Sequence, residues 1–323
     1  MAAPLILLSR HYDRVSALES GRVLINGERP QCEVMPTIPE TFKRLMNDDN
    51  VLAGEMSFGF QVAVASSDPN SRFMAIPVFL SRSFRHGNVF VRKNSHIEDF
   101  SQLKGMRVGL EEYAMTMGVW VRGLFEQAGV MPEDIKWYTA RNPVVIPEVE
   151  AKLRQRLSLQ KVNSSIWDLL EKNEIDAVIG RPPDYRDVTN GPFRQLLRDH
   201  WTHQRKYFSE TKIFPTMHVL VVRRDAYAQN PQIALDLFNA FEESKKLAIE
   251  DMRSNLNALT VSLPMLEAHV DETVKLFGDD WWPYGLKKNL AAVTAFTSYC
   301  LKQGVVYNPV TVEMLFCPNT LDL

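Results

Sequence analysis

The stretch LKGMRVGLEEYAMTMGVWVRGLFEQAGVMPEDIKWY, residues 103–138, indicates the fold most clearly. Within it, MRVGL is a short apolar run typical of a buried strand. A helical pattern then begins at Thr116 and ends at Gly129, a residue type that often closes a helix. EDIKWYTA predicts the next strand. Strand, helix and strand in this order are typical of a largely parallel sheet, so we predict an α/β fold.

The same alternation extends on both sides of this stretch. PLILLS, near the N-terminus, and GNVFVRKNS predict strands, and RFMAIPVFLS predicts a strand that Pro77 places at a sheet edge or bends. IPETFKRLMNDD predicts a helix that starts at Thr37 or Pro39, and SIWDLLEKNEIDAVIG predicts a helix followed by a strand. At 323 residues the chain exceeds the size at which one core keeps growing, so we expect two lobes.

Composition excludes several classes of function. Lys and Arg (37) nearly balance Asp and Glu (39), and the net charge of −2 comes without basic runs, so we expect no nucleic-acid partner. Three widely separated cysteines argue against a disulfide framework and a thiolate zinc site. No stretch approaches 18 apolar residues and the N-terminus lacks a basic signal-peptide region. We therefore expect a cytoplasmic protein with no membrane partner.

Polar residues gather just after the predicted strands, where open α/β sheets bind ligands. The exception is His218, which leads into a strand. We select as candidate ligand-binding residues Arg14, Glu55, Ser57, Arg82, Arg85, Tyr113, Thr116 and Arg181. His86, Glu112 and His218 are the candidate acids and bases, because their side chains exchange protons.

Each of these residues also has a simpler interpretation. Arg82 and Arg85, in RSFRHG, fit a solvated loop, although a guanidinium fork after a buried strand suits a carboxylate. Glu112 fits an acidic residue at a helix N-terminus, and His218 fits a buried core histidine. HWTH, residues 200–203, has a spacing that could ligate a metal but reads more simply as a surface helix. The sequence has no phosphate-binding glycine motif and no serine-hydrolase elbow.

Taken together, the stretch at 103–138 and the segments GEMSF, RSFRHG, LLEKNEIDAVIGRPP, FPTMH and WWPYGLKKNL resemble the 4,5-dihydroxyphthalate decarboxylase family, which has the type 2 periplasmic-binding-protein fold. The resemblance covers nearly the whole chain. It departs at WYTARNPVVIPEVE, where a glycine-rich turn is expected. It implies lobe one from residues 1–85 plus 214–323, lobe two from 86–213, and a ligand cleft between them that closes on its ligand. RSFRHG and FPTMH would then form the two crossings between the lobes.

The resemblance implies a carboxy-lyase of aromatic-compound catabolism, acting on a hydroxylated aromatic acid such as 4,5-dihydroxyphthalate to give protocatechuate. This chemistry needs a base near the phenol, an acid near the ring carbon and cations on the carboxylates. His86, Glu112 and His218 would move the protons, and Arg14, Arg82, Arg85 and Arg181 would hold the carboxylates. No organic cofactor is required, while a divalent metal and a homo-oligomer both stay open. The alternatives are a non-catalytic binding protein for an aromatic carboxylate, in uptake or sensing, and a biosynthetic enzyme on the same fold.

Overall fold

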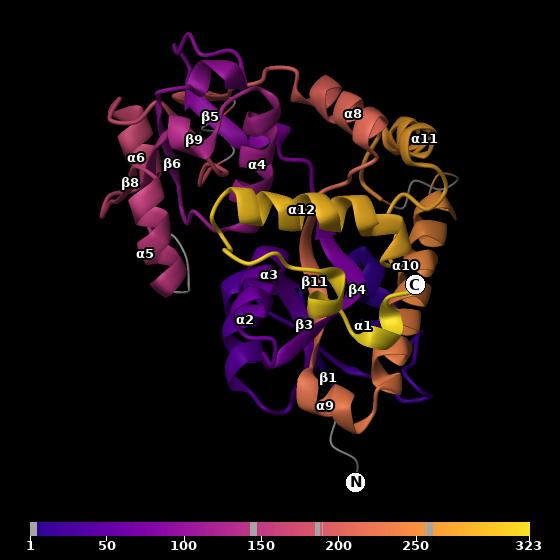
Figure 1. The fold of residues 1–323 in the computed structure, drawn as a ribbon. Helices are drawn as coiled ribbons and strands as arrows, with labels where there is room; N and C mark the ends of the chain where they lie inside the picture. Colours follow the sequence, from indigo (N-terminus) through magenta and orange to yellow (C-terminus); the bar gives the residue numbers. More distant parts are fainter. Residues whose placement is uncertain (1–4, 143–146, 185–187, 189, 255, 257–260) are drawn as a thin grey trace.

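The computed structural model describes residues 5–142, 147–184, 188, 190–254, 256 and 261–323, and it contains two β-sheets with helices packed around them (Figure 1). The strands are β1 (Ile6–Ser9), β2 (Gln31–Val34), β3 (Val51–Ser57), β4 (Phe73–Arg82), β5 (Val89–Arg92), β6 (Arg107–Leu110), β7 (Lys136–Thr139), β8 (Leu159–Lys161), β9 (Ala177–Ile179), β10 (Phe193–Gln195) and β11 (Thr216–Arg223).

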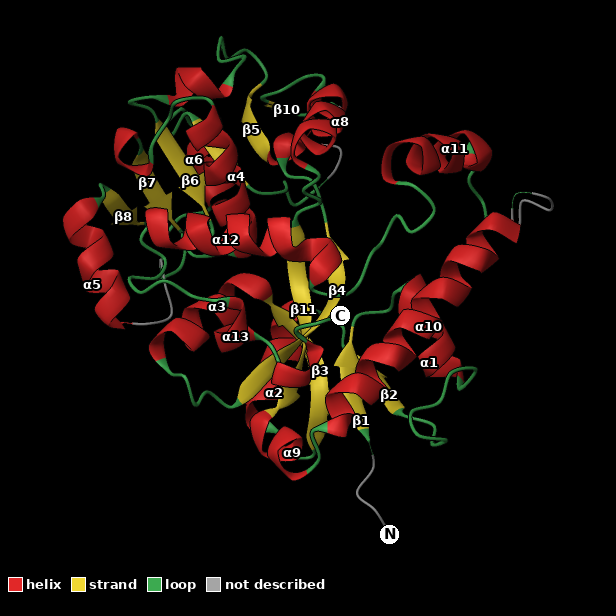
Figure 2. Ribbon diagram, turned by 45° about the vertical axis from the view of Figure 1, so that its right-hand side comes forward, coloured by secondary structure: helices red, strands yellow, loops and turns green. Residues whose placement is uncertain are grey.

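Most helices lie on the faces of these sheets (Figure 2). The helices are α1 (Ser16–Ser20), α2 (Ile38–Asn47), α3 (Phe58–Ser67), α4 (Thr116–Gln127), α5 (Pro147–Arg156), α6 (Ile166–Glu171), α8 (His200–Thr211), α9 (Arg224–Gln229), α10 (Gln232–Ser254), α11 (Leu266–Phe277), α12 (Leu290–Lys302) and α13 (Val312–Leu315). Of these, α12 lies across the junction of the sheets, and α11 stands apart from both sheets (Figure 2). Among the described residues, no helix is both long enough and apolar enough to span a membrane.

The first sheet has the order β2-β1-β3-β11-β4 and forms the core of lobe one. β1 is parallel to β2 and β3, whereas β11 is antiparallel to β3 and β4. As predicted from Pro77, β4 is an edge strand, and its pairing with β11 is irregular between Ile76 and Ser81. Because β11 runs against β3, the start of β11 lies at the carboxyl end of β3, and His218 pairs with Ser57. This reversal explains why His218, near the start of its strand, lies beside residues at the carboxyl ends of other strands.

The second sheet has the order β10-β5-β9-β6-β7-β8 and forms the core of lobe two. Its β9, β6, β7 and β8 are parallel, as the sequence at 103–138 predicts. α4 begins at Thr116, as expected, and Gly129 just beyond it has a φ of 79°, a conformation that glycine adopts without strain. The chain passes between the two sheets from β4 to β5 and again from β10 to β11.

The two lobes share one hydrophobic core. A single cluster of buried side chains includes Leu8 of β1 and Val108 of β6, one from each sheet. α12 joins the lobes most directly, because its fully buried Phe296 contacts Phe58 of α3 and Trp120 of α4, at ring separations of 5.1 and 5.2 Å. Both figures show α12 lying across the junction. The interior therefore continues from one lobe into the other.

Candidate active site

A cavity of about 500 Å³ lies between the lobes, at the carboxyl ends of the parallel strands. Lobe one contributes side chains from α2, β3, α3 and β11, among them Phe42, Ser57, Phe60, Met217 and His218. Lobe two contributes residues that follow β6 and β7, among them Glu112, Met115, Thr116, Met117 and Arg141, and Arg85 comes from the crossing between β4 and β5. The volume is that of a typical small-molecule site.

His218 is the histidine that lines this cavity, and a buried carboxylate orients it. Its Nδ1 lies 2.6 Å from Oε1 of Glu55, which is fully buried in β3. The same Oε1 accepts a hydrogen bond of 2.7 Å from the hydroxyl of Tyr12, and Oε2 accepts one of 3.1 Å from the backbone N–H of Arg10. With Nδ1 engaged by Glu55, Nε2 is the ring nitrogen of His218 left for a ligand in the cavity.

The hydrogen bonds keep Glu55 ionised in spite of its burial. Burial alone would raise the pKa of this carboxyl, but the hydrogen bond and charge of His218 and the hydrogen bond of Tyr12 outweigh it and hold the pKa below its ordinary value. An ionised Glu55 stabilises the imidazolium form of His218 when the ring takes up a proton, as the carboxylate of a catalytic triad does. The pair is therefore suited to general-base chemistry.

Arg85 presents a cation to the cavity without a carboxylate partner among the described residues. Its Nε donates to the sulfur of Met217 at 3.2 Å, and its Nη1 contacts Oδ1 of Asn88 at 3.3 Å and the sulfur of Met117 at 3.7 Å. Thioether sulfur is a weak acceptor. Burial and the nearby charge of Arg181 lower the pKa of Arg85 to about 9, which still leaves it charged at neutral pH. A buried guanidinium with such weak partners is a ready site for an anion.

Glu112 and Arg141 line the wall of lobe two. Burial raises the pKa of the Glu112 carboxyl above its ordinary value, with the charge of Arg141 acting in the opposite direction. A carboxyl of this kind is more readily protonated near neutral pH and can act as a general acid. The Arg141 guanidinium lies 3.7 Å from the carboxylate of Glu111; Arg141 is largely exposed and Glu111 is half-buried. Arg141 thus adds a second cation that can meet an anionic ligand.

Ser57 and Thr116 join the two walls at the base of the cavity. Their hydroxyl oxygens are 2.9 Å apart, and Thr116 Oγ1 also accepts a 3.0 Å hydrogen bond from the backbone N–H of Gly59. A Cβ on Gly59 would lie 2.9 Å from that same oxygen, so only glycine allows this approach. These two predicted ligand-binding residues line the cavity, and they also hold lobe one to lobe two.

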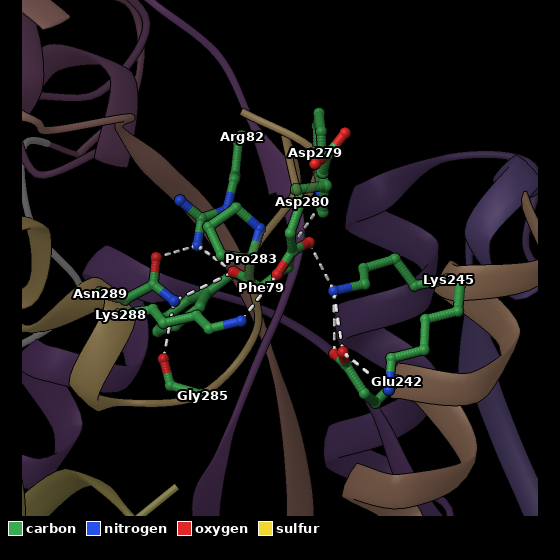
Figure 3. Close-up of polar contacts among 12 residues, drawn as sticks. Phe79, Arg82, Glu242, Lys245, Asp279, Asp280, Pro283, Gly285, Lys288 and Asn289 are labelled. Atoms are coloured by element: carbon green, nitrogen blue, oxygen red, sulfur yellow. Dashed lines mark hydrogen bonds and ion pairs between the residues drawn. The ribbon is translucent and has the colours of Figure 1, made fainter. Parts of the chain in front are cut away.

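The structure places Arg82 and Tyr113 away from the cavity. Arg82 is buried beside the segment before α12, where its Nη1 donates to the carbonyl of Phe214 at 3.1 Å and its Nη2 donates to the carbonyl of Pro283 at 2.8 Å and to the side chain of Asn289 (Figure 3). Tyr113 is fully buried and donates to the carbonyl of Gln303 at 3.1 Å. Both side chains form hydrogen bonds to the C-terminal part of the chain. They are therefore turned away from the cleft, although they lie at or just after the ends of strands.

Figure 3 also shows the ion pairs next to Arg82. The ammonium of Lys245, buried in α10, lies 3.0 Å from Glu242 and 2.8 Å from Asp280. Asp280 is paired in turn with Lys288 at 2.9 Å. These contacts anchor the segment between α11 and α12 on α10, so the cluster supports the position of α12.

Arg14 and Arg181 lie outside the lining of the cavity. Arg14 donates through Nε to the carbonyl of Leu80 at 2.8 Å, and its guanidinium stacks between the rings of Tyr12 and Trp282, at 4.0 and 4.2 Å from their centroids. Arg181 is an exposed residue that follows β9, and its positive charge contributes to lowering the pKa of Arg85. Neither residue is brought into the cavity wall.

His86 lies in a separate hollow and not with His218. It is buried against the ring of Tyr207 of α8, at a centroid separation of 5.3 Å, and within the described part of the chain its Nδ1 has no hydrogen-bond partner. Burial and the neighbouring His203 and His200 lower its pKa to about 4. The RSFRHG loop turns between Arg85 and His86, so only Arg85 faces the cavity. We therefore do not assign His86 a part in the chemistry of this cavity.

The described residues contain no group of three or more His, Cys, Asp or Glu side chains arranged to hold a metal ion. The HWTH segment forms the start of α8, where His203 is exposed and His200 is buried beside Gly87. Glu112 and His218 line the same cavity, while the third residue considered as a ligand, His86, is elsewhere.

Sequence reasoning missed Arg141, Tyr12, Met217 and Met117. Arg141 follows β7 just as Arg181 follows β9, so the strand-end rule that selected Arg181 also applied to it. Tyr12 follows β1 in the same way. The two methionines carried no signal, because methionine is common in ordinary cores.

Two lobes that enclose a small-molecule cavity at the carboxyl ends of their strands define a protein of the periplasmic-binding-protein fold, and comparison with solved structures agrees. The periplasmic aliphatic sulphonate-binding protein SsuA from Escherichia coli has a TM-score of 0.55 at 14% identity, covering 98% of this chain and 92% of that one. The alkanesulfonate-binding protein SsuA from Xanthomonas axonopodis pv. citri, bound to MOPS, has a TM-score of 0.56 at 13% identity, covering 97% and 98%.

Comparison with characterised sequences defines the family. The 4,5-dihydroxyphthalate decarboxylase of Comamonas testosteroni is 33% identical over 318 residues, which cover 97% of this chain and 96% of that protein. The enzyme of the same name from Pseudomonas putida is 30% identical over 197 residues, covering 58% and 75%. No family model matches the chain. The chain belongs to the 4,5-dihydroxyphthalate decarboxylase family, as its sequence motifs predict.

Proposed function

We propose that the protein is a carboxy-lyase that removes one carboxylate from a hydroxylated aromatic dicarboxylate such as 4,5-dihydroxyphthalate, giving protocatechuate and CO2. The observation that carries this proposal is the combination, in one cavity, of the Glu55–His218 pair and the unpaired cation Arg85. Membership of the decarboxylase family supports it. A binding protein needs the cation alone, whereas decarboxylation also needs groups that move protons.

The cavity wall fits an aromatic dianion. Phe42, Phe60 and Met115 supply apolar surface for a ring, and Arg85 and Arg141 supply two cations for its carboxylates. The guanidinium of Arg85 can bind one carboxylate through two parallel hydrogen bonds. Because Arg85 is more buried than Arg141, its charge is screened less by water and interacts more strongly with a bound carboxylate.

Direct loss of CO2 from an aromatic ring would leave an unstable aryl carbanion. A hydroxyl group para to the departing carboxylate avoids this intermediate. When the hydroxyl loses its proton, its electron density reaches the carbon that bears the carboxylate, and that carbon takes a proton. The C–C bond to CO2 then breaks, and its electron pair restores the aromatic ring and the phenolate. The reaction consumes one proton overall.

Two residues of the cavity have the properties that these steps require. His218, oriented by Glu55, accepts the hydroxyl proton on Nε2 and returns it to the phenolate at the end. Glu112, whose pKa burial raises, delivers a proton to the ring carbon and is reprotonated from solvent. Removing one such acid or base typically lowers the rate by ~10²–10⁴-fold without abolishing binding.

The test is to incubate the protein with 4,5-dihydroxyphthalate and to measure both CO2 and protocatechuate. Wild type should release equimolar amounts, and His218→Asn and Glu112→Gln should each bind the compound but turn it over at least ~10²-fold more slowly. His269→Asn is the matched control, since His269 is an exposed residue of α11. If the wild type binds the compound but releases no CO2, the protein is a binding protein. If both variants react at the wild-type rate, other residues carry the proton transfers.

A further inference from the structure

Tyr12 and His218 share one oxygen of Glu55. The Tyr12 hydroxyl donates to Oε1 at 2.7 Å, and His218 Nδ1 lies 2.6 Å from that same atom. Among the described residues, the other oxygen, Oε2, accepts a hydrogen bond from the backbone N–H of Arg10 alone. Both donors therefore draw on the charge of a single buried oxygen, and a change in one contact must alter the other.

The ring of Tyr12 is fixed from outside the cavity. Arg14 lies 4.0 Å from its centroid and 4.2 Å from that of Trp282, so the guanidinium is held between the two rings. Arg14 is tied to the carbonyl of Leu80, and Trp282 Nε1 donates to the carbonyl of Phe79 at 3.0 Å. These contacts hold the Tyr12 ring with its hydroxyl directed at Glu55.

We propose that Tyr12 is a positioning residue for the proton chemistry of His218: by donating to the oxygen that His218 uses, it reduces the negative charge that Glu55 can offer to the imidazolium. The expected effect of Tyr12 on turnover rests on the proposed function. The effect of Tyr12 on the proton affinity of His218 does not, because it can be measured in the protein without substrate. Tyr12 does not line the cavity and touches no substrate, so it acts only through Glu55.

The direction of the effect follows from the geometry. Tyr12→Phe removes the hydroxyl and keeps the ring that Arg14 stacks on. Glu55 then concentrates its charge on His218, which binds its proton more tightly and titrates at a higher pH. A base must be unprotonated to act, so the acid limb of the kcat/KM profile should move up with it. A shift of roughly 0.5–1 pH unit is expected for redistribution of one charge-assisted hydrogen bond.

Other charges near His218 stay the same in this variant. Arg85 from the crossing, and Glu112 and Arg141 from lobe two, line the same cavity, and Arg14 stays against the ring at position 12. Tyr227→Phe is the matched control. It removes a hydroxyl that contacts Asn319 at 3.2 Å, in α9 and away from the cavity.

The experiment follows the His218 ring by NMR in protein labelled with ¹³C-histidine, assigns its signal with His218→Asn, and titrates wild type, Tyr12→Phe and Tyr227→Phe without substrate. The kcat/KM profile with 4,5-dihydroxyphthalate is measured on the same proteins. An upward shift of the His218 titration in Tyr12→Phe alone, matched by the acid limb of kcat/KM, supports the proposal. If the His218 titration is the same in Tyr12→Phe and in the wild type, the proposal is overturned, whatever the turnover rates are. A shifted titration with no CO2 from the wild type refutes the proposed function and leaves the coupling between Tyr12 and His218 intact.

Discussion

Arg82 and Arg85 are three residues apart in the sequence, yet their surroundings differ completely. Arg82 is satisfied by the carbonyls of Phe214 and Pro283 and by Asn289, whereas Arg85 has two thioethers and one amide. Both were selected from the sequence because both follow the apolar run MAIPVFL, although Arg82 is the last residue of β4. Residue type could not separate them, since the partners of Arg82 come from distant parts of the chain: Phe214 just before β11, and Pro283 and Asn289 before α12.

We predict that Arg85→Lys weakens the binding of an aromatic carboxylate by about tenfold, equivalent to about 1.4 kcal/mol. A lysine keeps the charge but replaces the two-pronged donor with a single point. Isothermal titration calorimetry with 4,5-dihydroxyphthalate measures the effect. Arg198→Lys, at an exposed residue paired with Glu98, is the control and should bind as the wild type does. Equal affinity of Arg85→Lys and wild type would show that Arg85 is not the anchor.

His86 predicts a pH dependence of stability. Its pKa of about 4 in the folded protein lies below the ordinary value of 6.5, so the unfolded chain binds more protons between these values. The free energy of unfolding should therefore fall as the pH drops from about 6.5 to about 4, by about 3 kcal/mol if this group acts alone.

Urea unfolding across that pH range measures the slope. His86→Phe should flatten it, because the ring no longer titrates, and His96→Phe, at an exposed position, should leave it as in the wild type. An identical slope in wild type and His86→Phe would mean that His86 is free to protonate in the folded state.

At the scale of elements, local signals in the sequence were sufficient for much of the fold. Thr37 caps α2 by accepting a hydrogen bond from the N–H of Glu40, and Pro77 marks the edge strand β4. The position of His218 depended on the antiparallel insertion of β11, which the strand-end rule does not describe. Arg141 lies in the stretch where the sequence departs from the expected glycine-rich turn, so the resemblance assigned no role to it. The separation of His86 from the cavity depends on how a short loop turns, and residue types do not determine that.

The contact between α4 and α12 is close enough to predict the effect of one added methyl group. A Cβ on Gly123 would lie 2.5 Å from the ring of Tyr299, a rigid side chain of α12. Gly123→Ala should destabilise the protein by ~1–3 kcal/mol, because overpacking outweighs the better helix propensity of alanine.

Thermal unfolding of Gly123→Ala in two backgrounds tests this contact. Tyr299→Leu removes the ring, so Gly123→Ala should cost much less in that background than in the wild type. An equal cost in both backgrounds would place the strain somewhere other than between these helices.

At the scale of the whole molecule, the sequence led us to expect that the lobes close on the ligand. The shared core and the bridge through Phe296 change that expectation, since opening the cleft would expose buried rings on both sides of α12. We predict that small-angle X-ray scattering shows little change in the radius of gyration when 4,5-dihydroxyphthalate binds. Phe296→Ala is the companion variant and should make the ligand-free protein more expanded than the wild type. Clear compaction of the wild type on binding would show that α12 allows the lobes to part.

The place of β11 between β3 and β4 also has a consequence for biosynthesis. The ribosome delivers β3 and β4 early, then every strand of the second sheet, and only afterwards the strand that separates the first two. The second sheet is contiguous in the chain and can form as it emerges, while β3 and β4 wait with open edges. At ~5–20 residues per second, that wait is on the order of ten seconds. During translation the nascent chain therefore exposes β-strand edges that other chains could pair with. The cavity cannot form until β11, which ends at residue 223 of 323, has been synthesised.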